Sequence, residues 1–264
     1  MFKAFRARMR RIKDQLALLE QLRVPLEELP GGQEQWIQDS MEWLIEQFGS
    51  DVFNRPIVRP SAFIPAGYDG SEAAARKLFE KVRERMGVPR GRLVLRFDLD
   101  DIDPAVIHTK AQRQLTGATR LRFGLWVPGR NRNTVFTSRR LLGEPSVLVA
   151  NFAHEIGHEL LIGEGRITSD RPDHESLTDL LSVFQGFGIF VANASFGPLP
   201  GGDRNGTMAM SYLRERALSD ALAYYAFRRG TRGVPPWEDE LDRPVRSGLI
   251  ARLKQLQDAA QPGK

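Results

Sequence analysis

Two histidines, His154 and His158, stand four residues apart, and Glu155 directly follows the first of them. On a helix, residues four apart lie on one face, so both imidazoles can bind one metal ion. Glu155 lies beside them and can act on a water that the metal holds. The chain has only four histidines, so this spacing is improbable by chance. The pattern predicts a metal site in which Glu155 can act on the metal-bound water.

A zinc ion that takes part in catalysis usually has three protein ligands and keeps one position for water, so a third ligand must lie elsewhere. The chain has no cysteine, which excludes thiolate ligands, disulfides and a cysteine nucleophile. We therefore expect a carboxylate. Glu175 and Asp179 are also four residues apart and share a helix face, which makes Glu175 the preferred third ligand. The alternatives are Glu164, His174 and Asp173.

HExxH on one helix and ExxxD on the next resemble the pattern of the gluzincin zinc metallopeptidases. The resemblance covers residues 150–180, and the short spacing is similar to compact peptidases that cleave repressors or act in protein quality control. It implies that Asp179 hydrogen-bonds the first histidine, because a ligating imidazole usually donates its other N–H to a carboxylate. The zinc ligands that the resemblance implies are His154, His158 and Glu175, and the general base that it implies is Glu155.

Two positions distinguish this chain from known zincin patterns. An uncharged residue normally follows the second histidine, and here that residue is Glu159. Glu164 stands where metzincins place their third ligand, but those proteins need a glycine at the position of Leu161 to turn the chain back. The missing glycine favours Glu175 over Glu164.

These residues predict hydrolysis of a peptide bond by a metal-activated water, with a peptide or a protein as the substrate. Charge that develops on the substrate oxygen needs a further donor, and Tyr212, His174 and Arg166 have suitable chemistry. Two alternatives stay open. One is another zinc hydrolase reaction with the same ligands. The other is a catalytically inactive zincin fold that acts as a binding or regulatory module.

Two helices must position the metal ligands, and the sequence predicts them over 145–162 and from about 173 onward. Strands are expected over 92–97, 120–126 and 133–138. The last strand directly precedes the active helix, so we expect it to form the edge of the cleft and to pair with an extended peptide. Further helices are expected over 2–22, 33–48, 71–86, 212–228 and 245–258.

This order of elements predicts an α+β fold: a zincin-like core with a small, mostly antiparallel sheet, an active-site helix, a ligand helix and an N-terminal helical arm. We expect the arm and a linker over residues 1–59 and the metallopeptidase domain over residues 60–264. Apolar residues within 2–19 repeat in steps of three and four, as in a coiled-coil seam. The arm can therefore pack on its own domain, self-associate with a second copy, or lie on a membrane surface.

The composition is that of a soluble globular protein, with 41% hydrophobic and 27% charged residues. Six cations within residues 1–13 account for the net charge of +5, because 32 basic and 33 acidic residues remain without them. We therefore predict no nucleic-acid partner. The apolar segment 180–202 is interrupted by polar residues and prolines, so we expect no membrane span. With no secretory signal visible, a cytoplasmic location is expected.

Overall fold

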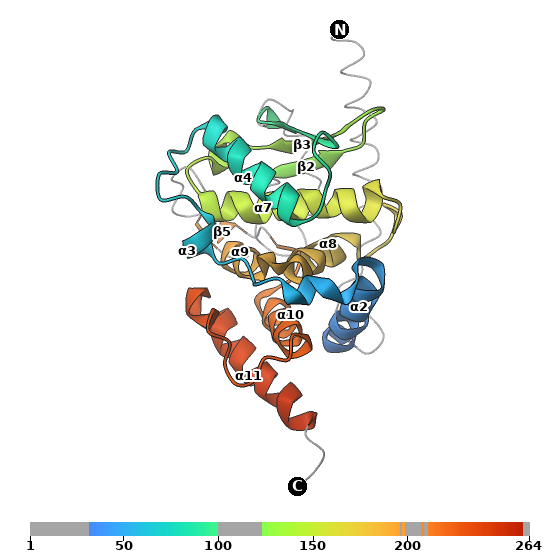
Figure 1. Cartoon of the computed structure of the whole chain (residues 1–264), viewed down its shortest axis with the longest axis vertical. Helices are drawn as coiled ribbons and strands as arrows, with labels where there is room; N and C mark the ends of the chain where they lie inside the picture. The colour runs from blue at the N-terminus through green and yellow to red at the C-terminus, as the bar shows by residue number, and fades with distance from the viewer. Residues whose placement is uncertain (1–31, 100–122, 196, 199–206, 209–210, 261–264) are drawn as a thin grey trace.

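The structure is a computed structural model with a mixed α+β fold (Figure 1). The α+β class expected from the sequence is therefore confirmed. The helix expected over 2–22 and the self-association predicted for 2–19 lie outside the described residues. The described residues are 32–99, 123–195, 197–198, 207–208 and 211–260.

Local sequence signals locate the ends of the main helices. Helix α4 (Glu72–Arg85) begins after Ser71, whose hydroxyl accepts a hydrogen bond of 3.1 Å from the backbone N–H of Ala74. Helix α7 (Pro145–His158) begins with its proline in the first turn, where no N–H is needed. The remaining α-helices are α2 (Gly32–Phe48), α3 (Pro60–Phe63), α8 (His174–Ser182), α9 (Gly188–Ala194), α10 (Glu215–Arg228) and α11 (Arg243–Ala259).

Short helical turns connect several of these helices. A π-helical turn follows α7 directly, and a second one joins α8 to α9. These π-helical turns are η5 (Glu159–Gly163) and η6 (Val183–Phe187). The 3-10 helices are η2 (Ser50–Asn54), η4 (Arg139–Leu141) and η7 (Glu238–Glu240).

The main sheet has three strands among the described residues, in the order β1-β3-β2. The central strand pairs parallel with β1 and antiparallel with β2, so the sheet is mixed where a mostly antiparallel one was expected. The strands are β1 (Leu93–Arg96), β2 (Gly124–Val127) and β3 (Asn133–Thr137). A separate antiparallel pair consists of β4 (Gly197–Pro198) and β5 (Thr207–Met208).

The predicted position of the cleft edge is wrong. We expected the strand over 133–138 to be the edge, but β3 is paired on both sides. Alternation of apolar residues identifies a strand without specifying its neighbours. Of the two strands beside β3, β2 lies against α7 and is therefore the strand that borders the active helix.

The elements stack in layers (Figure 1). The sheet and α4 lie at one end, followed by α7, then by α8 and α9, then by α10, with α11 at the other end. Helix α7 is therefore placed between the sheet and the helix that follows it in the core, α8. Its histidines can be contacted from both directions.

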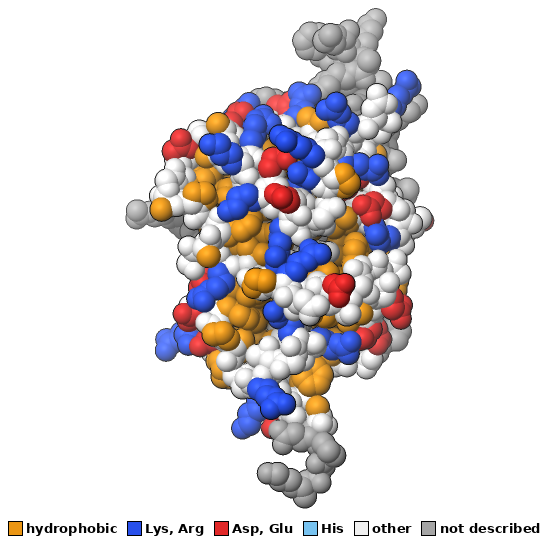
Figure 2. Space-filling view, in the orientation of Figure 1, with side chains coloured by type: hydrophobic (Ala, Val, Ile, Leu, Met, Phe, Trp, Pro, Cys, Tyr) orange, Lys and Arg blue, Asp and Glu red, His pale blue; other side chains and the backbone are white. Residues whose placement is uncertain are grey.

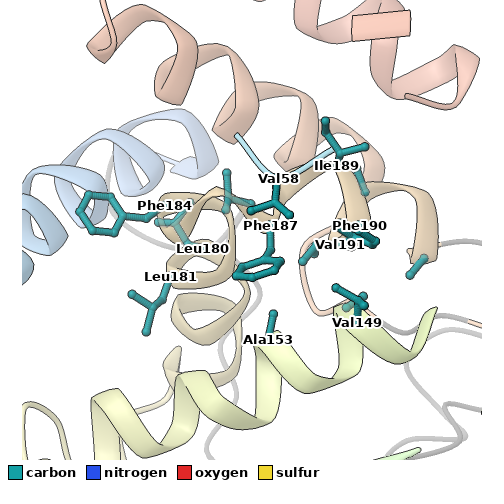
Figure 3. Close-up of a cluster of buried hydrophobic side chains, with 14 of the residues drawn as sticks. Val58, Val149, Ala153, Leu180, Leu181, Phe184, Phe187, Ile189, Phe190 and Val191 are labelled. Carbon is teal, nitrogen blue, oxygen red and sulfur yellow. The ribbon is translucent and has the colours of Figure 1, made fainter. Parts of the chain in front are cut away.

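Apolar packing sets the spacing between α7 and the α8–α9 segment. Figure 3 shows Val149 and Ala153 of α7 facing Phe187 and its neighbours, and these side chains are fully buried. Gly157 allows the two helices to approach closely, because a Cβ there would lie only 2.8 Å from Cγ2 of Thr178 in α8. The glycine inside HExxH therefore brings the ligand helix up to the two histidines.

The segment from α2 to residue 59 shares this hydrophobic core. Trp36, Ile37 and Leu44 are buried in the same cluster as α8 and α10. The indole N–H of Trp36 also donates to the carboxylate of Asp173, at 2.8 Å, just before α8 begins. The described part of the expected N-terminal arm therefore supports the loop that leads into the ligand helix, and the domain boundary at residue 60 stays a prediction.

One helical stretch of the described residues, His174–Ala194, is long and apolar enough to cross a membrane. It is 94% buried within the protein, and Gly186 interrupts it with a φ of 93°. The stretch is therefore a core element of this fold. On the outer face drawn in Figure 2, Lys and Arg side chains are interspersed with Asp and Glu, and ion pairs such as Arg139–Glu72 join neighbouring elements.

Candidate metal centre

The three ligands expected from the sequence lie together in the structure. Nε2 of His154 is 3.1 Å from Nε2 of His158 and 3.1 Å from Oε2 of Glu175. Nε2 of His158 is 3.3 Å from the same oxygen. Among the described residues, these side chains form the one group of His, Asp and Glu whose ligand atoms all lie within 4.8 Å of one another. Two helices therefore direct three donors at a single point.

The separations between these donors match what a metal ion requires. Bonds of about 2.0–2.1 Å in a tetrahedral arrangement place ligand atoms roughly 3.3 Å apart. The observed separations are 3.1, 3.1 and 3.3 Å. Two imidazole nitrogens and one carboxylate oxygen form a donor set that suits zinc and related transition-metal ions. The residues present therefore fit such an ion.

Asp179 contacts the ring nitrogen of His154 that does not face the other ligands. Its Oδ1 lies 2.7 Å from Nδ1 of His154, and this hydrogen bond leaves Nε2 directed at the other two ligands. The second oxygen of Asp179 accepts hydrogen bonds from the hydroxyl of Ser211 at 2.8 Å and from the backbone N–H groups of Tyr212 and Leu213. Residues 211–213, just before α10, thus hold the carboxylate of Asp179 in place, and this carboxylate in turn orients His154.

The charges of these groups are strongly coupled. Burial alone would lower the pKa of His154, but Asp179 and Glu175 raise this pKa well above its ordinary value. Burial lowers the pKa of His158 to about 4, against the attraction of Glu175. Burial would raise the pKa of Glu175, but the neighbouring histidines hold this pKa well below its ordinary value. The site therefore keeps a buried carboxylate ionised, as a cation site requires.

Glu155, the predicted base, lies on the side of α7 that faces the sheet. Only 5% of its surface is exposed. A Cβ on Gly124 of β2 would lie 2.4 Å from Oε1 of Glu155 and 2.4 Å from Oδ1 of Asn151. The backbone of β2 therefore approaches the carboxylate as closely as a glycine permits. We did not predict Gly124 or Asn151 as site residues, although a glycine within an alternating strand is a sign of close backbone approach.

Tyr212 and His174 both lie beside the ligands. The ring of Tyr212 stacks on that of His154, with centroids 5.5 Å apart and an angle of 22° between the planes. His174 places Nε2 3.6 Å from Oε1 of Glu175, while its Nδ1 is 2.8 Å from the backbone carbonyl of Arg171. The structure thus brings both predicted catalytic residues to the candidate centre.

Two rival ligands, Glu164 and Asp173, and the donor candidate Arg166 have other partners. Glu164 pairs with Arg166, and the same guanidinium donates to the backbone carbonyl of Leu160 at 2.8 Å. Asp173 accepts hydrogen bonds from Trp36 and Arg171. None of these three side chains belongs to the group of converging ligand atoms among the described residues.

Glu159, the position that departs from the zincin pattern, is a fully buried carboxylate. It accepts hydrogen bonds from Nε of Arg92 at 2.6 Å, from Nε1 of Trp126 at 2.9 Å and from Nδ2 of Asn133 at 2.6 Å. These donors lie just before β1, on β2 and at the start of β3. The unusual charge next to His158 was the one sign of this network in the sequence.

Comparisons with models of known protein families, with curated proteins and with solved structures found no significant match. The interpretation of the site therefore depends on the two motifs and on the geometry in which the fold arranges them. Fold alone would not establish an activity in any case, because one fold can carry many functions.

Proposed function

We propose that this protein is a zinc-dependent peptidase of the gluzincin type. The convergence of His154, His158 and Glu175 from two helices, with Glu155 next to His154 in α7, supports this proposal above all other observations. A bound zinc ion would supply a Lewis acid that polarises the scissile carbonyl and activates water. The remaining chemistry belongs to side chains of this chain.

Glu155 acts as the general base. It directly follows the first ligand in the sequence, and its buried carboxylate lies against the backbone of Gly124. The carboxylate takes a proton from the attacking water and later delivers it to the leaving amine, so that no proton is gained or lost over the cycle. Its close fit against β2 holds the carboxylate in place for both transfers.

The outer strand β2 is where the peptide substrate pairs. Among the described strands, β2 has a hydrogen-bonded neighbour on one side only, and it lies along α7. An extended peptide that adds to this strand would run past Gly124 and therefore past Glu155. Main-chain hydrogen bonds would bind the substrate irrespective of much of its sequence, so we assign a peptide or a protein as the substrate.

Tyr212 is the stronger donor for the charge that develops on the substrate oxygen. Its ring stacks on His154, which places it next to the ligands, and a phenol can donate a hydrogen bond at neutral pH. His174 lies equally near, but its Nδ1 faces the carbonyl of Arg171. With that nitrogen donating, Nε2 of His174 can donate only when the ring is protonated.

The substitution Glu155→Gln tests the assignment. Purified wild-type protein should contain stoichiometric zinc and hydrolyse members of a mixed peptide library. The amide in this variant preserves the shape of the side chain but cannot accept the proton, so the variant should keep the zinc and lose about 10²- to 10⁴-fold in kcat. The exposed residue Glu46 provides the matched control, and Glu46→Gln should retain full activity.

Three results would change the proposal in different ways. Wild-type protein without affinity for zinc would remove the metal site. Unchanged activity of Glu155→Gln would reject the assigned base. Zinc binding with no hydrolysis of any peptide would favour either a non-peptide substrate or a binding role for an inactive zincin fold.

A further inference from the structure

The two histidine ligands are oriented by different means. Nδ1 of His154 has a carboxylate partner at 2.7 Å. Nδ1 of His158 faces the hydroxyl of Thr178 at 3.5 Å, which is the limit of a hydrogen bond. The ring of His158 instead packs among the rings of His154, His174 and Trp126, whose centroids lie 4.7, 6.1 and 6.4 Å away. Its orientation therefore depends on where those rings are held.

Trp126 is held by Glu159. The indole Nε1 donates to Oε2 of Glu159 at 2.9 Å, and this carboxylate belongs to the residue directly after His158. Nε of Arg92 donates to the other oxygen of Glu159 at 2.6 Å, and hydrogen bonds between charged groups are shorter and stronger than those between neutral groups. The bond from Glu159 to Trp126 thus links the backbone next to His158 with the ring that packs against His158.

The backbone around Glu159 is shaped to enclose its carboxylate. Helix α7 ends at His158, and the π-helical turn η5 begins at Glu159. A Cβ at Gly163, the last residue of η5, would lie 2.8 Å from Cδ of Glu159, so only a glycine leaves the carboxylate its room. Nη2 of Arg92 also donates to the carbonyl of Gly163 at 3.3 Å. Single-turn π-helices of this kind often occur at functional sites.

We infer that Glu159 is a positioning residue of the metal centre, which acts through Trp126 to fix the ring of His158. Since His158 matters here as a metal ligand, this role rests on the proposed function. The sheet thereby supports the second histidine by packing, whereas Asp179 supports the first by a direct hydrogen bond. A carboxylate that only fastened the sheet to α7 would contribute to stability and leave metal affinity unchanged.

The substitutions Glu159→Gln and Trp126→Phe separate these two roles. Trp126→Phe keeps an aromatic ring and the Arg92–Glu159 ion pair while removing one donor, so its fold should persist. We expect the Kd for zinc, measured by chelator competition at fixed pH, to rise about 10- to 100-fold in Glu159→Gln, the range typical of outer-shell partners. Trp126→Phe should give about a 10-fold increase. The absorption bands of the cobalt-loaded protein should shift in both variants.

Glu240→Gln is the matched control. Glu240 also pairs with an arginine, Arg59, and its carboxylate accepts hydrogen bonds from Ser61, two residues after Arg59 in the chain. This substitution removes an arginine–carboxylate pair whose partners belong to the segment around α3. Its zinc Kd should stay within about two-fold of the wild-type value even if its Tm falls.

Each outcome decides the role of Glu159. Folded Glu159→Gln and Trp126→Phe proteins with the zinc Kd of the wild type would overturn it, and if Glu159→Gln does not fold, Trp126→Phe decides alone. If the wild type binds no zinc, the proposed function fails separately. The imidazole ¹⁵N resonances of His158 in metal-free wild type and Trp126→Phe then decide: a shift supports positioning, and identical resonances reject it.

Discussion

The candidate centre is supported from two sides of α7, and the two sides are constructed differently. On the side of α8, Asp179 bonds directly to His154 and is itself held by residues 211–213. On the side of the sheet, Glu159 reaches His158 only through Trp126. A direct hydrogen bond fixes both the tautomer and the plane of a ring, whereas packing restricts the plane alone.

This difference predicts an order of importance. The α8 side contributes a ligand as well as an orienting carboxylate, so damage there should reduce metal binding most. The sheet side contributes the base-facing glycine of β2 and the indirect support of His158, so damage there should reduce metal affinity less than damage on the α8 side. Substitutions on each side can test this order.

The largest effect should come from Glu175→Gln on the α8 side. The amide removes the ionised oxygen that lies 3.1 Å from His154 and 3.3 Å from His158. We expect zinc affinity to fall by more than the 10- to 100-fold typical of outer-shell partners, and hydrolysis to become undetectable. Chelator competition measures this change. Zinc affinity equal to that of the wild type would show that Glu175 is not a ligand.

Asp179→Asn should come next. The amide can still accept from the backbone of Tyr212 and Leu213, but it cannot hold the N–H of His154 as a carboxylate does. We expect zinc affinity to fall 10- to 100-fold, with a loss at least as large as in Glu159→Gln. A clearly smaller loss than in Glu159→Gln would reverse the proposed order of the two sides.

The two sides also differ in how far the sequence revealed them. Glu175 and Asp179 could be found because both lie within one helical repeat, so that spacing alone places them on one face. Trp126 and Asn133 meet Glu159 only because β1, β2 and β3 assemble in the order β1-β3-β2, with a parallel pair that local alternation does not encode. Contacts within one helix were predictable, and contacts that depend on strand order were not.

Gly124→Ala tests the sheet side without touching a ligand. The new Cβ would lie 2.4 Å from Oε1 of Glu155, so either the carboxylate or β2 must move. Displacement of a catalytic group by about 1 Å can cost roughly 10²-fold in rate. We expect kcat to fall by about that factor while the zinc Kd stays within about two-fold. Equal losses in kcat and in zinc affinity would show that Gly124 is needed for the fold as a whole and does not specifically position the base.

Gly157→Ala tests the contact that joins the two sides. Its Cβ would approach Cγ2 of Thr178 to 2.8 Å and would push α8 away from α7. Overpacking of this kind typically costs about 1–3 kcal/mol of stability. The metal-free protein should therefore melt at a lower temperature, and zinc affinity should fall as well because Glu175 moves with α8. A lower Tm with unchanged zinc affinity would show that the ligands tolerate a wider spacing.

The smallest effect should come from Glu240→Gln, which belongs to neither side and supplies their baseline. Burial would raise the pKa of Glu240, but hydrogen bonds from Ser61 and Arg59 hold this pKa below its ordinary value. A carboxyl whose pKa is lower in the folded state stabilises the fold above its unfolded pKa of about 4.3, and this contribution is lost as the pH falls through the folded value. The Tm difference between wild type and variant should therefore be largest near neutral pH and shrink below about pH 4. A difference that stays constant down to acid pH would mean that shape, and not charge, makes the contribution of Glu240.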